Sequence, residues 1–456
     1  MAEIPRRDNR DQDQLHKSPC GAVKRLTDIV VKKVNRLNGT VKAPPSKSYT
    51  HRALIAAALS EGTSNIENAL ICDDTLATVN ACSMLGAEIH QTKEGTFEVR
   101  GHSKLVTPPD VVNCKDSAST MRFLTPVCAL ADGISVLTGG DSLRRRPMNP
   151  ALTALRQLGV QCYSTRGNGC PPLVMFGGKI PGGKTCLRGD ISSQFVSGLL
   201  FAAPMAEKDV DIVLSTPLVS KPYVKMTLKV LQEHGVHVKV QSGYGKFHVP
   251  SQQKYKPHDH AIEGDYSSAA FLLAAATITD SHVKVENLAR NSVQGDRAIV
   301  DLLTKMNVQV NIGEDFVEVH GLNGELKPVN VDLRDNPDLV PVCAVLCCLA
   351  AGKSVIRSVK RLRFKESDRI AALLSELTKL GAKINASNDV LEIEGVPEFH
   401  AAQLDSHGDH RIAMACVVAA LRTRGRTVIR GVECINKSYP KFLRDIVHLG
   451  GEIVER

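Results

Sequence analysis

The sequence predicts an α/β protein made of six repeated β/α units that are divided between two domains. Three observations lead to this expectation: regularly spaced turns at helix ends, a second series of very apolar helices, and a length of 456 residues. A single hydrophobic core seldom serves more than about 250–300 residues. Six units of about 70 residues therefore suggest two domains with three units each.

The first series consists of helices that end in a turn residue and lead into a β-rich stretch. Gly and Asn are favoured there because they adopt the left-handed conformation at little cost. These turn residues lie 69 to 76 positions apart, at Gly86, Gly159, Gly235, Asn307, Gly381 and Gly450. Such regular spacing indicates a repeated unit.

The second series consists of Ala-rich helices that begin after a polar residue. Helices that are apolar on nearly all sides have to be buried. The polar residues are Ser46, Asp116, Asp190, Asp265, Asn336 and Asp409, in phase with the first series. We therefore expect each unit to hold one buried helix and one half-exposed helix, alternating with strands; the first strand should cover residues 28–32.

The domain boundaries are expected near residues 43–45 and just before Glu263. Residues 45–262 would then form an inserted domain, and residues 22–44 with 263–456 a discontinuous one. Two crossings between domains form a hinge, and a hinge suggests closure on a ligand bound in the interdomain cleft. Residues 1–21 are polar with mixed charges and are expected to form a disordered tail.

Composition favours an enzyme that acts on small anions over a nucleic-acid or membrane protein. The formal charge is +9 but is dispersed along the chain, and only 4% of the residues are aromatic, with no Trp, which disfavours base stacking. No apolar run is long enough to span a bilayer, and no secretory signal is present. The 13 Cys include no CxxC pair, so we expect reduced thiols and a cytoplasmic protein.

Several predicted helices begin with cations, which is unusual. Lys47 and Arg52 lie within about two turns of a helix start, where each cation costs roughly 0.3–1 kcal/mol. A bound anion would explain them; the alternative is that both point into solvent. Polar or charged helix starts also occur at Ser119–Arg122, Ser192–Gln194 and Arg411. Ordinary capping is an equal alternative for each alone, but together they favour a shared anion site.

Further charged residues lie on predicted loops. Arg146 precedes Pro147, which we place in the first turn of a helix. Lys365, Glu366 and Arg369 are placed at the start of a helix over residues 370–380, and Lys437 precedes the last helix. Each could instead be a solvated charged turn. His51, His407 and His410 lack metal-ligand spacing, so we expect no metal site, and no phosphate-binding glycine loop is present.

Taken in order, these motifs resemble the 3-phosphoshikimate 1-carboxyvinyltransferase (5-enolpyruvylshikimate-3-phosphate, or EPSP, synthase) family from about residue 28 to the end. The family fold has two domains of three β/α units with helices inside, the enolpyruvyl transferase fold. The motifs are Ser46-Lys47-Ser48 with Arg52, Ser119 to Arg122, Arg146-Pro147, Ser192-Ser193-Gln194, Ser220-Lys221-Pro222-Tyr223, Pro337-Asp338, Lys365 to Arg369, Asp409-His410-Arg411 and Lys437.

The resemblance implies transfer of the enolpyruvyl group of phosphoenolpyruvate to the 5-hydroxyl of 3-phosphoshikimate, through a tetrahedral intermediate, in the shikimate pathway. It implies no cofactor, and we expect a monomer. The residues implied to contact 3-phosphoshikimate are Lys47, Ser48, Arg52, Ser192, Ser193, Gln194, Ser220, Asp338 and Lys365. Those implied to contact phosphoenolpyruvate are Lys47, Ala118, Arg146, Gln194, Arg369, Arg411 and Lys437.

The catalytic residues expected from the resemblance are Asp338 at the 5-hydroxyl, and Glu366 with Lys47 for the proton on carbon. An acid at neutral pH needs a raised pKa, whereas neighbouring cations would lower the pKa of Glu366. Which group carries which proton therefore stays open.

Several positions depart from the common bacterial pattern, and two of them bear on the substrate site. Ala118 replaces a Gly and places a methyl group towards the phosphoenolpyruvate pocket, which predicts weaker binding of the inhibitor glyphosate. Arg361 replaces an Asn, so no contact is transferred to it.

Two other functions were considered. The sister transferase that uses UDP-N-acetylglucosamine has an Asn after its first Lys and a Cys in the loop before its Arg-Pro. This chain has Ser48 after Lys47 and no Cys in residues 141–146. A basic scaffold that binds RNA would not need Asp338 or Glu366, and its affinity would fall steeply with salt.

Overall fold

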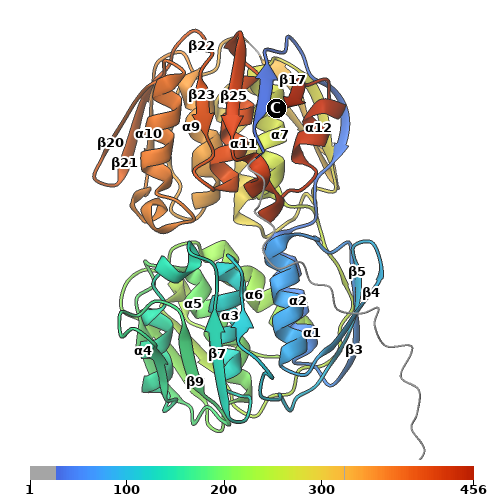
Figure 1. The fold of residues 1–456 in the computed structure, drawn as a ribbon, viewed down its shortest axis with the longest axis vertical. Coiled ribbons are helices and arrows are strands. Elements are labelled where there is room, and N and C mark those ends of the chain that lie inside the picture. Colours follow the sequence, from blue (N-terminus) through green and yellow to red (C-terminus); the bar gives the residue numbers. More distant parts are fainter. Residues whose placement is uncertain (1–26, 323) are drawn as a thin grey trace, which may run out of the picture.

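The computed structural model describes residues 27–322 and 324–456. The expected disordered tail, residues 1–21, lies outside the described residues. The chain forms two lobes, one above the other along the longest axis (Figure 1). Buried hydrophobic side chains form one core from residues 49–262 and a second core from residues 29–43 and 266–449.

The lobe formed by residues 45–262, here called the inserted lobe, contains three four-stranded sheets. Its first unit has β3 (Gly62–Glu67), β4 (Glu88–Lys93), β5 (Thr96–Gly101), β14 (His260–Ala261), α1 (Lys47–Ala58) and α2 (Asp73–Met84). The second has β6 (Val112–Asn113), β7 (Ile134–Thr138), β8 (Cys162–Ser164), β9 (Leu173–Phe176), α3 (Ala118–Cys128) and α4 (Asn149–Gln157). The third has β10 (Gly183–Leu187), β11 (Val210–Leu214), β12 (Lys239–Val240), β13 (Lys246–Val249), α5 (Ser193–Ala202) and α6 (Lys221–Glu233).

The other lobe, here called the terminal lobe, repeats this pattern. Its first unit has β2 (Asn38–Lys42), β15 (His282–Glu286), β16 (Val308–Ile312), β17 (Phe316–Leu322), α7 (Tyr266–Ile278) and α8 (Ala298–Lys305). The second has β18 (Asn330–Asp332), β19 (Lys353–Arg357), β20 (Lys383–Ser387), β21 (Val390–Glu394), α9 (Val340–Cys348) and α10 (Arg369–Lys379). The third has β1 (Ile29–Lys32), β23 (Gln403–Asp405), β25 (Arg426–Arg430), β26 (Ile453–Glu455), α11 (His410–Ala420) and α12 (Phe442–His448), with a small added pair, β22 (Phe399–His400) and β24 (Thr423–Arg424).

The repeat predicted from the turns is confirmed. All six predicted turn residues have positive φ, from 72° at Asn307 to 110° at Gly86. The buried helices α1, α3, α5, α7, α9 and α11 lie inside the lobes, and every residue of α7 is buried. Cys343, Cys347, Cys348 and Cys416 are buried free thiols, as expected. Among the described helices, none has the length and apolar character needed to cross a bilayer.

Two helix starts differ from the prediction. Pro147 lies before α4 and not in its first turn. A residue before proline avoids the helical region, and Arg146 is accordingly extended. Pro150 takes the place in the first turn. Helix α10 begins at Arg369, capped by the Asp368 carboxylate. Lys365 and Glu366 therefore lie on the preceding loop.

The chain passes between the lobes through two segments that lie side by side. The Ser46 amide donates to the Glu263 carbonyl over 2.8 Å, and the Asp265 amide donates to the Pro44 carbonyl over 2.8 Å. Both crossings therefore form one short hydrogen-bonded ribbon between β2 and α1 on one side and β14 and α7 on the other.

Candidate active site

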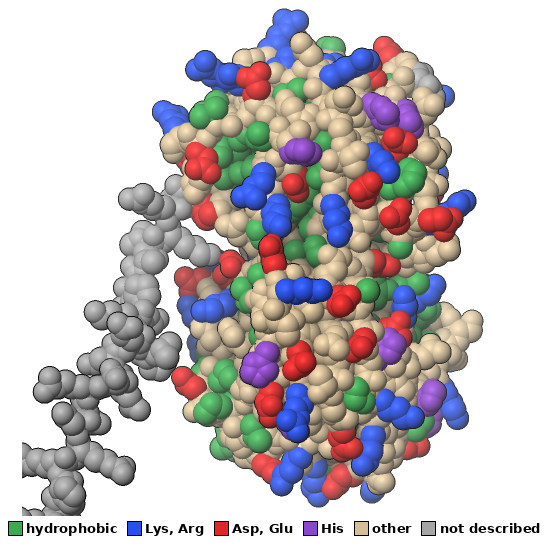
Figure 2. All heavy atoms as spheres, turned by 90° about the vertical axis from the view of Figure 1, so that its right-hand side faces the viewer, with side chains coloured by type: hydrophobic (Ala, Val, Ile, Leu, Met, Phe, Trp, Pro, Cys, Tyr) green, Lys and Arg blue, Asp and Glu red, His purple; other side chains and the backbone are tan. Residues whose placement is uncertain are grey.

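A cavity of about 640 Å³ lies between the lobes. Its walls include residues at or just before the starts of all six buried helices, three from each lobe: Lys47, Ala118, Ser193, Ser267, Asp338 and Arg411. The predicted convergence of polar helix starts is therefore present. On the outer face shown in Figure 2, by contrast, acidic and basic side chains are interspersed.

Lys47 is the first residue of α1 and points into the cavity. Ser46 caps the helix by accepting from the Tyr49 amide. The Lys47 ammonium lies 3.0 Å from the Asp74 carboxylate, and both side chains are largely buried. Burial alone would lower the pKa of Lys47, but Asp74 together with Cys72 and Glu366 outweighs it and the pKa is raised. The unfavourably placed cation thus has an internal partner and stays charged.

Arg52 lies behind the cavity wall and does not line it. Its guanidinium donates to the Thr227 hydroxyl over 2.8 Å and to the carbonyls of Ser48 and Tyr223 over 2.8 and 2.9 Å. It also stacks over the Phe123 ring. In this arrangement Arg52 ties α1 to α6, because three of its five N–H donors bond to groups of these two helices.

Arg369 is the centre of an ion-pair network in the terminal lobe, and its side chain is 1% exposed. It donates to Asp409 over 2.7 Å, to Asp338 over 2.8 Å and to Glu366 over 3.0 Å. Asp338 also accepts from Lys365 over 3.4 Å. The predicted cations of this lobe are therefore already paired with carboxylates.

Glu366 connects the two lobes. Its carboxylate lies 3.4 Å from Arg146 of the inserted lobe and 3.5 Å from Lys437. Lys437 in turn donates to the Asp116 carbonyl over 2.8 Å. A second contact joins Arg361 of the terminal lobe to Ser220 of the inserted lobe, since Arg361 donates to the Ser220 hydroxyl over 2.8 Å. Polar contacts between the lobes are therefore made by residues that line the cavity, among them Arg146, Glu366, Arg361 and Ser220.

The protonation states follow from this packing. Burial alone would raise the pKa of Asp338, but Lys365, Arg411 and Arg369 hold it well below its usual range. The pKa of Glu366 is lowered in the same way by Lys437, Arg146 and Arg369. Burial lowers the pKa of Lys365 to about 8, although Asp338 opposes it. Both carboxylates are thus ionised.

The sequence model of the family described as EPSP synthase (3-phosphoshikimate 1-carboxyvinyltransferase) matches residues 31–446. The chain belongs to the EPSP synthase family. It is 44% identical over 431 residues to the 3-phosphoshikimate 1-carboxyvinyltransferase of Methanococcus maripaludis strain C5, covering 93% of this chain and 99% of the relative.

Solved structures agree with this assignment. The fold matches EPSP synthase from Acinetobacter baumannii with a TM-score of 0.80 at 27% identity, covering 94% of this chain and all of that one. It also matches the enolpyruvyl transferase NikO from Streptomyces tendae, with a TM-score of 0.76 at 20% identity and coverage of 94% and 99%, which concerns the fold alone. The resemblance and the enolpyruvyl transferase fold expected from the sequence are confirmed.

Most of the site residues predicted from the EPSP synthase motifs line the cavity. They are Lys47, Ser48, Ala118, Arg146, Ser192, Ser193, Gln194, Ser220, Asp338, Lys365, Glu366, Arg369 and Arg411. Arg52 and Lys437 do not, since their charged ends are held by other protein groups. Gln194 is fixed by Arg122, which donates to its side-chain oxygen over 2.7 Å, and by its own donation to Ser119 over 2.9 Å.

Three cavity residues were missed or set aside at the sequence level. Asp74 pairs with Lys47, and the acidic pair at the start of α2 was the available signal. The Tyr223 hydroxyl lies 3.3 Å from both Asp338 and Asp296 and can donate to either; Tyr223 belongs to one of the EPSP synthase motifs, but no role was predicted for it. Arg361, to which no contact was transferred, lines the cavity and holds Ser220.

Proposed function

We propose that this chain transfers the enolpyruvyl group of phosphoenolpyruvate to the 5-hydroxyl of 3-phosphoshikimate and releases phosphate. The observation that carries this proposal is a cavity between the lobes in which six helix starts bring cations and two ionised carboxylates together, in a chain of the EPSP synthase family. Two multiply charged anions repel each other, and closely placed cations in a water-poor cleft reduce that repulsion most effectively.

For 3-phosphoshikimate we propose the hydroxyl-rich side of the cavity. Ser48, Ser192, Ser193 and Ser220 offer hydroxyls, and Gln194 an amide; Lys365 adds a charge, and Asp338 would accept the 5-hydroxyl proton. Arg52 would act indirectly, because it lies behind the cavity wall and holds the Ser48 end of α1 in place. Its three bonds to protein groups support this indirect role.

For phosphoenolpyruvate we propose the side lined by Lys47, Arg146, Arg369, Arg411 and Ala118. Arginines can bind a carboxylate or phosphate through two parallel bonds, whereas Lys47 acts as a point charge. Gln194 would lie between both substrates. Lys437 would contribute through Glu366, which it neutralises at 3.5 Å.

The proposed proton transfers depend on a change of ion-pair partners when the substrates bind. When substrate anions bind Arg369, Lys365 and Arg146, these cations interact less with Asp338 and Glu366, so the pKa of both carboxyls rises. Asp338 can then take the 5-hydroxyl proton as the O5–C2 bond forms. The Lys47 ammonium, or Glu366 once its raised pKa has let it take up a proton, supplies a proton to C3. In the second step C3 returns a proton to that same group, the C2–O bond to phosphate breaks, and phosphate leaves with the electron pair of that bond.

We propose further that the lobes act as two domains, residues 22–44 with 263–456 and residues 45–262, that close on 3-phosphoshikimate. The side-by-side crossings support a hinge at residues 43–46 and 263–265. The cavity is complete within one chain, which supports a monomer. Buried free thiols fit a reducing compartment, and we place the protein in the cytoplasm.

The direct test is phosphate release from the purified chain with phosphoenolpyruvate, with 3-phosphoshikimate, and with both. We expect release only with both, together with formation of 5-enolpyruvylshikimate 3-phosphate by mass spectrometry. A folded sample that releases no phosphate with both substrates refutes the proposal. Arg363→Met, on the exposed surface, serves as an active control.

Glyphosate inhibition should become stronger when the methyl group of Ala118 is removed. Ala118 is buried in the cavity wall, and crowding by one methyl group costs about 1–3 kcal/mol. Ala118→Gly should therefore lower the inhibition constant for glyphosate about tenfold, measured by competition with phosphoenolpyruvate. Equal inhibition constants for both proteins contradict this reading of Ala118.

The value of kcat/KM for 3-phosphoshikimate should fall as pH rises through about 8, the pKa of Lys365. Lys365 is charged below this pH and neutral above it, and kcat/KM follows groups of the free enzyme. From pH 7 to pH 9 we expect a decrease of about tenfold. Lys365→Arg stays charged and should flatten the profile; an unchanged decline in this variant assigns the titration to another group.

A further inference from the structure

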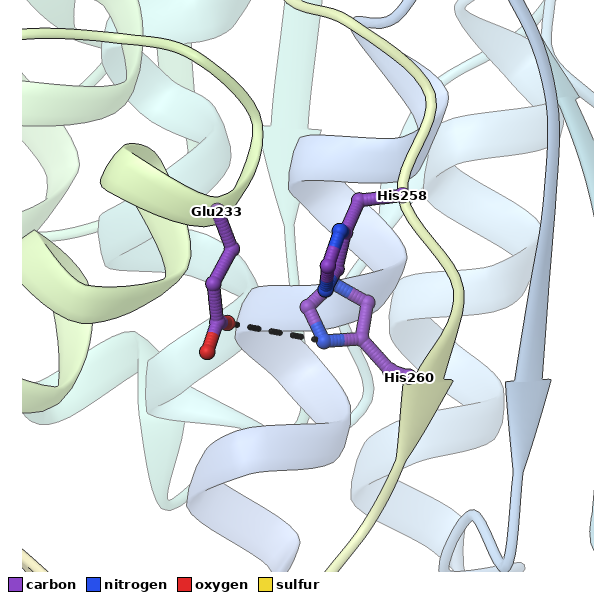
Figure 3. Close-up of side chains that lie close together, drawn as sticks. All are labelled: Glu233, His258 and His260. Carbon is purple, nitrogen blue, oxygen red and sulfur yellow. Dashed lines mark ion pairs between the residues drawn. The ribbon is translucent and has the colours of Figure 1, made fainter.

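A cluster of metal-ligating side chains lies in the inserted lobe (Figure 3). Glu233 is the last residue of α6, His260 is the first residue of β14, and His258 lies just before that strand. Each offers one ligand atom, and these atoms lie within 4.8 Å of one another. None of the three lines the cavity.

Hydrogen bonds around the cluster determine which nitrogen of His260 carries its proton. His234 Nδ1 lies 2.7 Å from the Lys256 carbonyl, which only accepts, so Nδ1 donates. In the neutral ring, His234 Nε2 is then an acceptor. It lies 2.9 Å from His260 Nε2, which must be the donor. His260 Nδ1 is therefore left with a free lone pair, and it faces the Glu233 carboxylate at 3.7 Å.

This is the arrangement found around metal-bound histidines. Such a histidine donates its second ring N–H to a neighbouring acceptor, which fixes the ring and its tautomer. Here His234 is that acceptor, and the Lys256 carbonyl fixes His234 in turn. At 3.7 Å the two groups could also form an ion pair, but that would need a proton on Nδ1, which the hydrogen bonds above place on Nε2 instead.

The segment that carries both histidines is held against the neighbouring strand. The His258 amide donates to the Ser64 hydroxyl over 3.0 Å, and the Asp259 carboxylate accepts from the Asn65 amide over 2.7 Å. His260 pairs with Ile66 of β3 in parallel register. Two ligands are thus supplied by a fixed backbone.

We propose that Glu233, His258 and His260 bind a divalent transition-metal ion of the Zn²⁺ type, with His234 as a positioning residue. Two imidazoles and a carboxylate are a known zinc donor set and leave one position for water. Metal–ligand distances of about 2.0–2.2 Å require the ligand atoms to draw together slightly. The metal would also replace Lys229, whose ammonium lies 3.9 Å from Glu233.

A second histidine cluster in the terminal lobe lacks this feature. The Nε2 atoms of His282 and His320 lie 2.8 and 3.0 Å from the Glu318 carboxylate, so both nitrogens already contact it. His282 is also 58% exposed. This cluster, defined by His282, Glu318 and His320, provides the internal comparison for the test.

A bound metal would join the end of α6 to the segment that leads into the second crossing between lobes. The first turn of α6 carries Tyr223 of the cavity. The metal would therefore hold one cavity wall against the hinge without taking part in the reaction. This inference does not rest on the proposed function, and its readout is metal binding.

The test uses the full chain after removal of metals with a chelator, and Zn²⁺ alone as the probe. We expect about one tightly bound Zn²⁺ per chain at the cluster by calorimetry and elemental analysis. Bound Co²⁺ should show the visible absorption of a four-coordinate site. Glu233→Gln and His258→Asn should each weaken Zn²⁺ binding about tenfold or more.

Matched controls separate this site from others. His237→Asn changes an exposed histidine four residues from Glu233 and should leave affinity unchanged. The double variant His282→Asn, His320→Asn should also retain the Zn²⁺. No Zn²⁺ binding, or binding that only the double variant abolishes, overturns the proposal. Circular dichroism of each variant confirms that loss of binding is not loss of fold.

Discussion

Asp338→Asn should lower kcat about 10²–10⁴-fold, the usual contribution of a general base. The amide keeps the size of the side chain and an oxygen for the 2.8 Å bond from Arg369, but it cannot accept the 5-hydroxyl proton. Because Asp338 would act on the bound substrate, KM for phosphoenolpyruvate should change much less than kcat. Phosphate release under saturation measures the effect.

The control for this prediction is Tyr223→Phe, which removes a hydrogen bond to Asp338 and leaves the carboxylate in place. It should lower kcat much less than Asp338→Asn. A kcat for Asp338→Asn within tenfold of the unchanged protein would assign the base elsewhere, and Glu366→Gln would then be tested in the same assay.

Arg369→Met should destabilise the protein by roughly 3–5 kcal/mol, the cost of leaving a buried charge without its partner. Arg369 contacts three carboxylates, and the side chain of Asp409 is fully buried. Removing the guanidinium leaves like charges close together. Urea unfolding of the terminal lobe measures the loss, and the variant should also lose enolpyruvyl transfer.

Arg363→Met is the matched control for this stability measurement. Arg363 forms a 2.9 Å ion pair with Asp368, but its side chain is 41% exposed. Exposed pairs contribute about 0–1 kcal/mol, so the midpoint should hardly move. A similarly small change for Arg369→Met would show that solvent enters the network.

The repeat was predictable because its signals are local. Positive φ at Gly86 or Asn307 depends on one residue and the helix before it. The Ser46, Asp265 and Asp409 caps likewise act within three residues. The sequence therefore indicated where buried helices begin, and these starts converge on the cavity.

The direction of individual side chains was harder to predict, because it depends on packing between distant segments. Arg52 was predicted to contact substrate, which stays a prediction; its bonds to Thr227 and to the Tyr223 carbonyl of α6 were not predicted. Lys47 was predicted to bind an anion, but its ion pair with Asp74 was not predicted. Glu366 meets Arg146, 220 positions away, and no local spacing indicates such a pair.

The path of the chain also sets an order of events during synthesis. Strand β1 lies between β25 and β26, so its sheet cannot close until Ile453–Glu455 has been made. The inserted lobe, in contrast, has all its strands once Ala261 has left the ribosome. Since domains generally fold as units and the earlier one first, the inserted lobe should be native while β2 is still without β15 (His282–Glu286) and β1 is without both of its neighbours, β25 and β26.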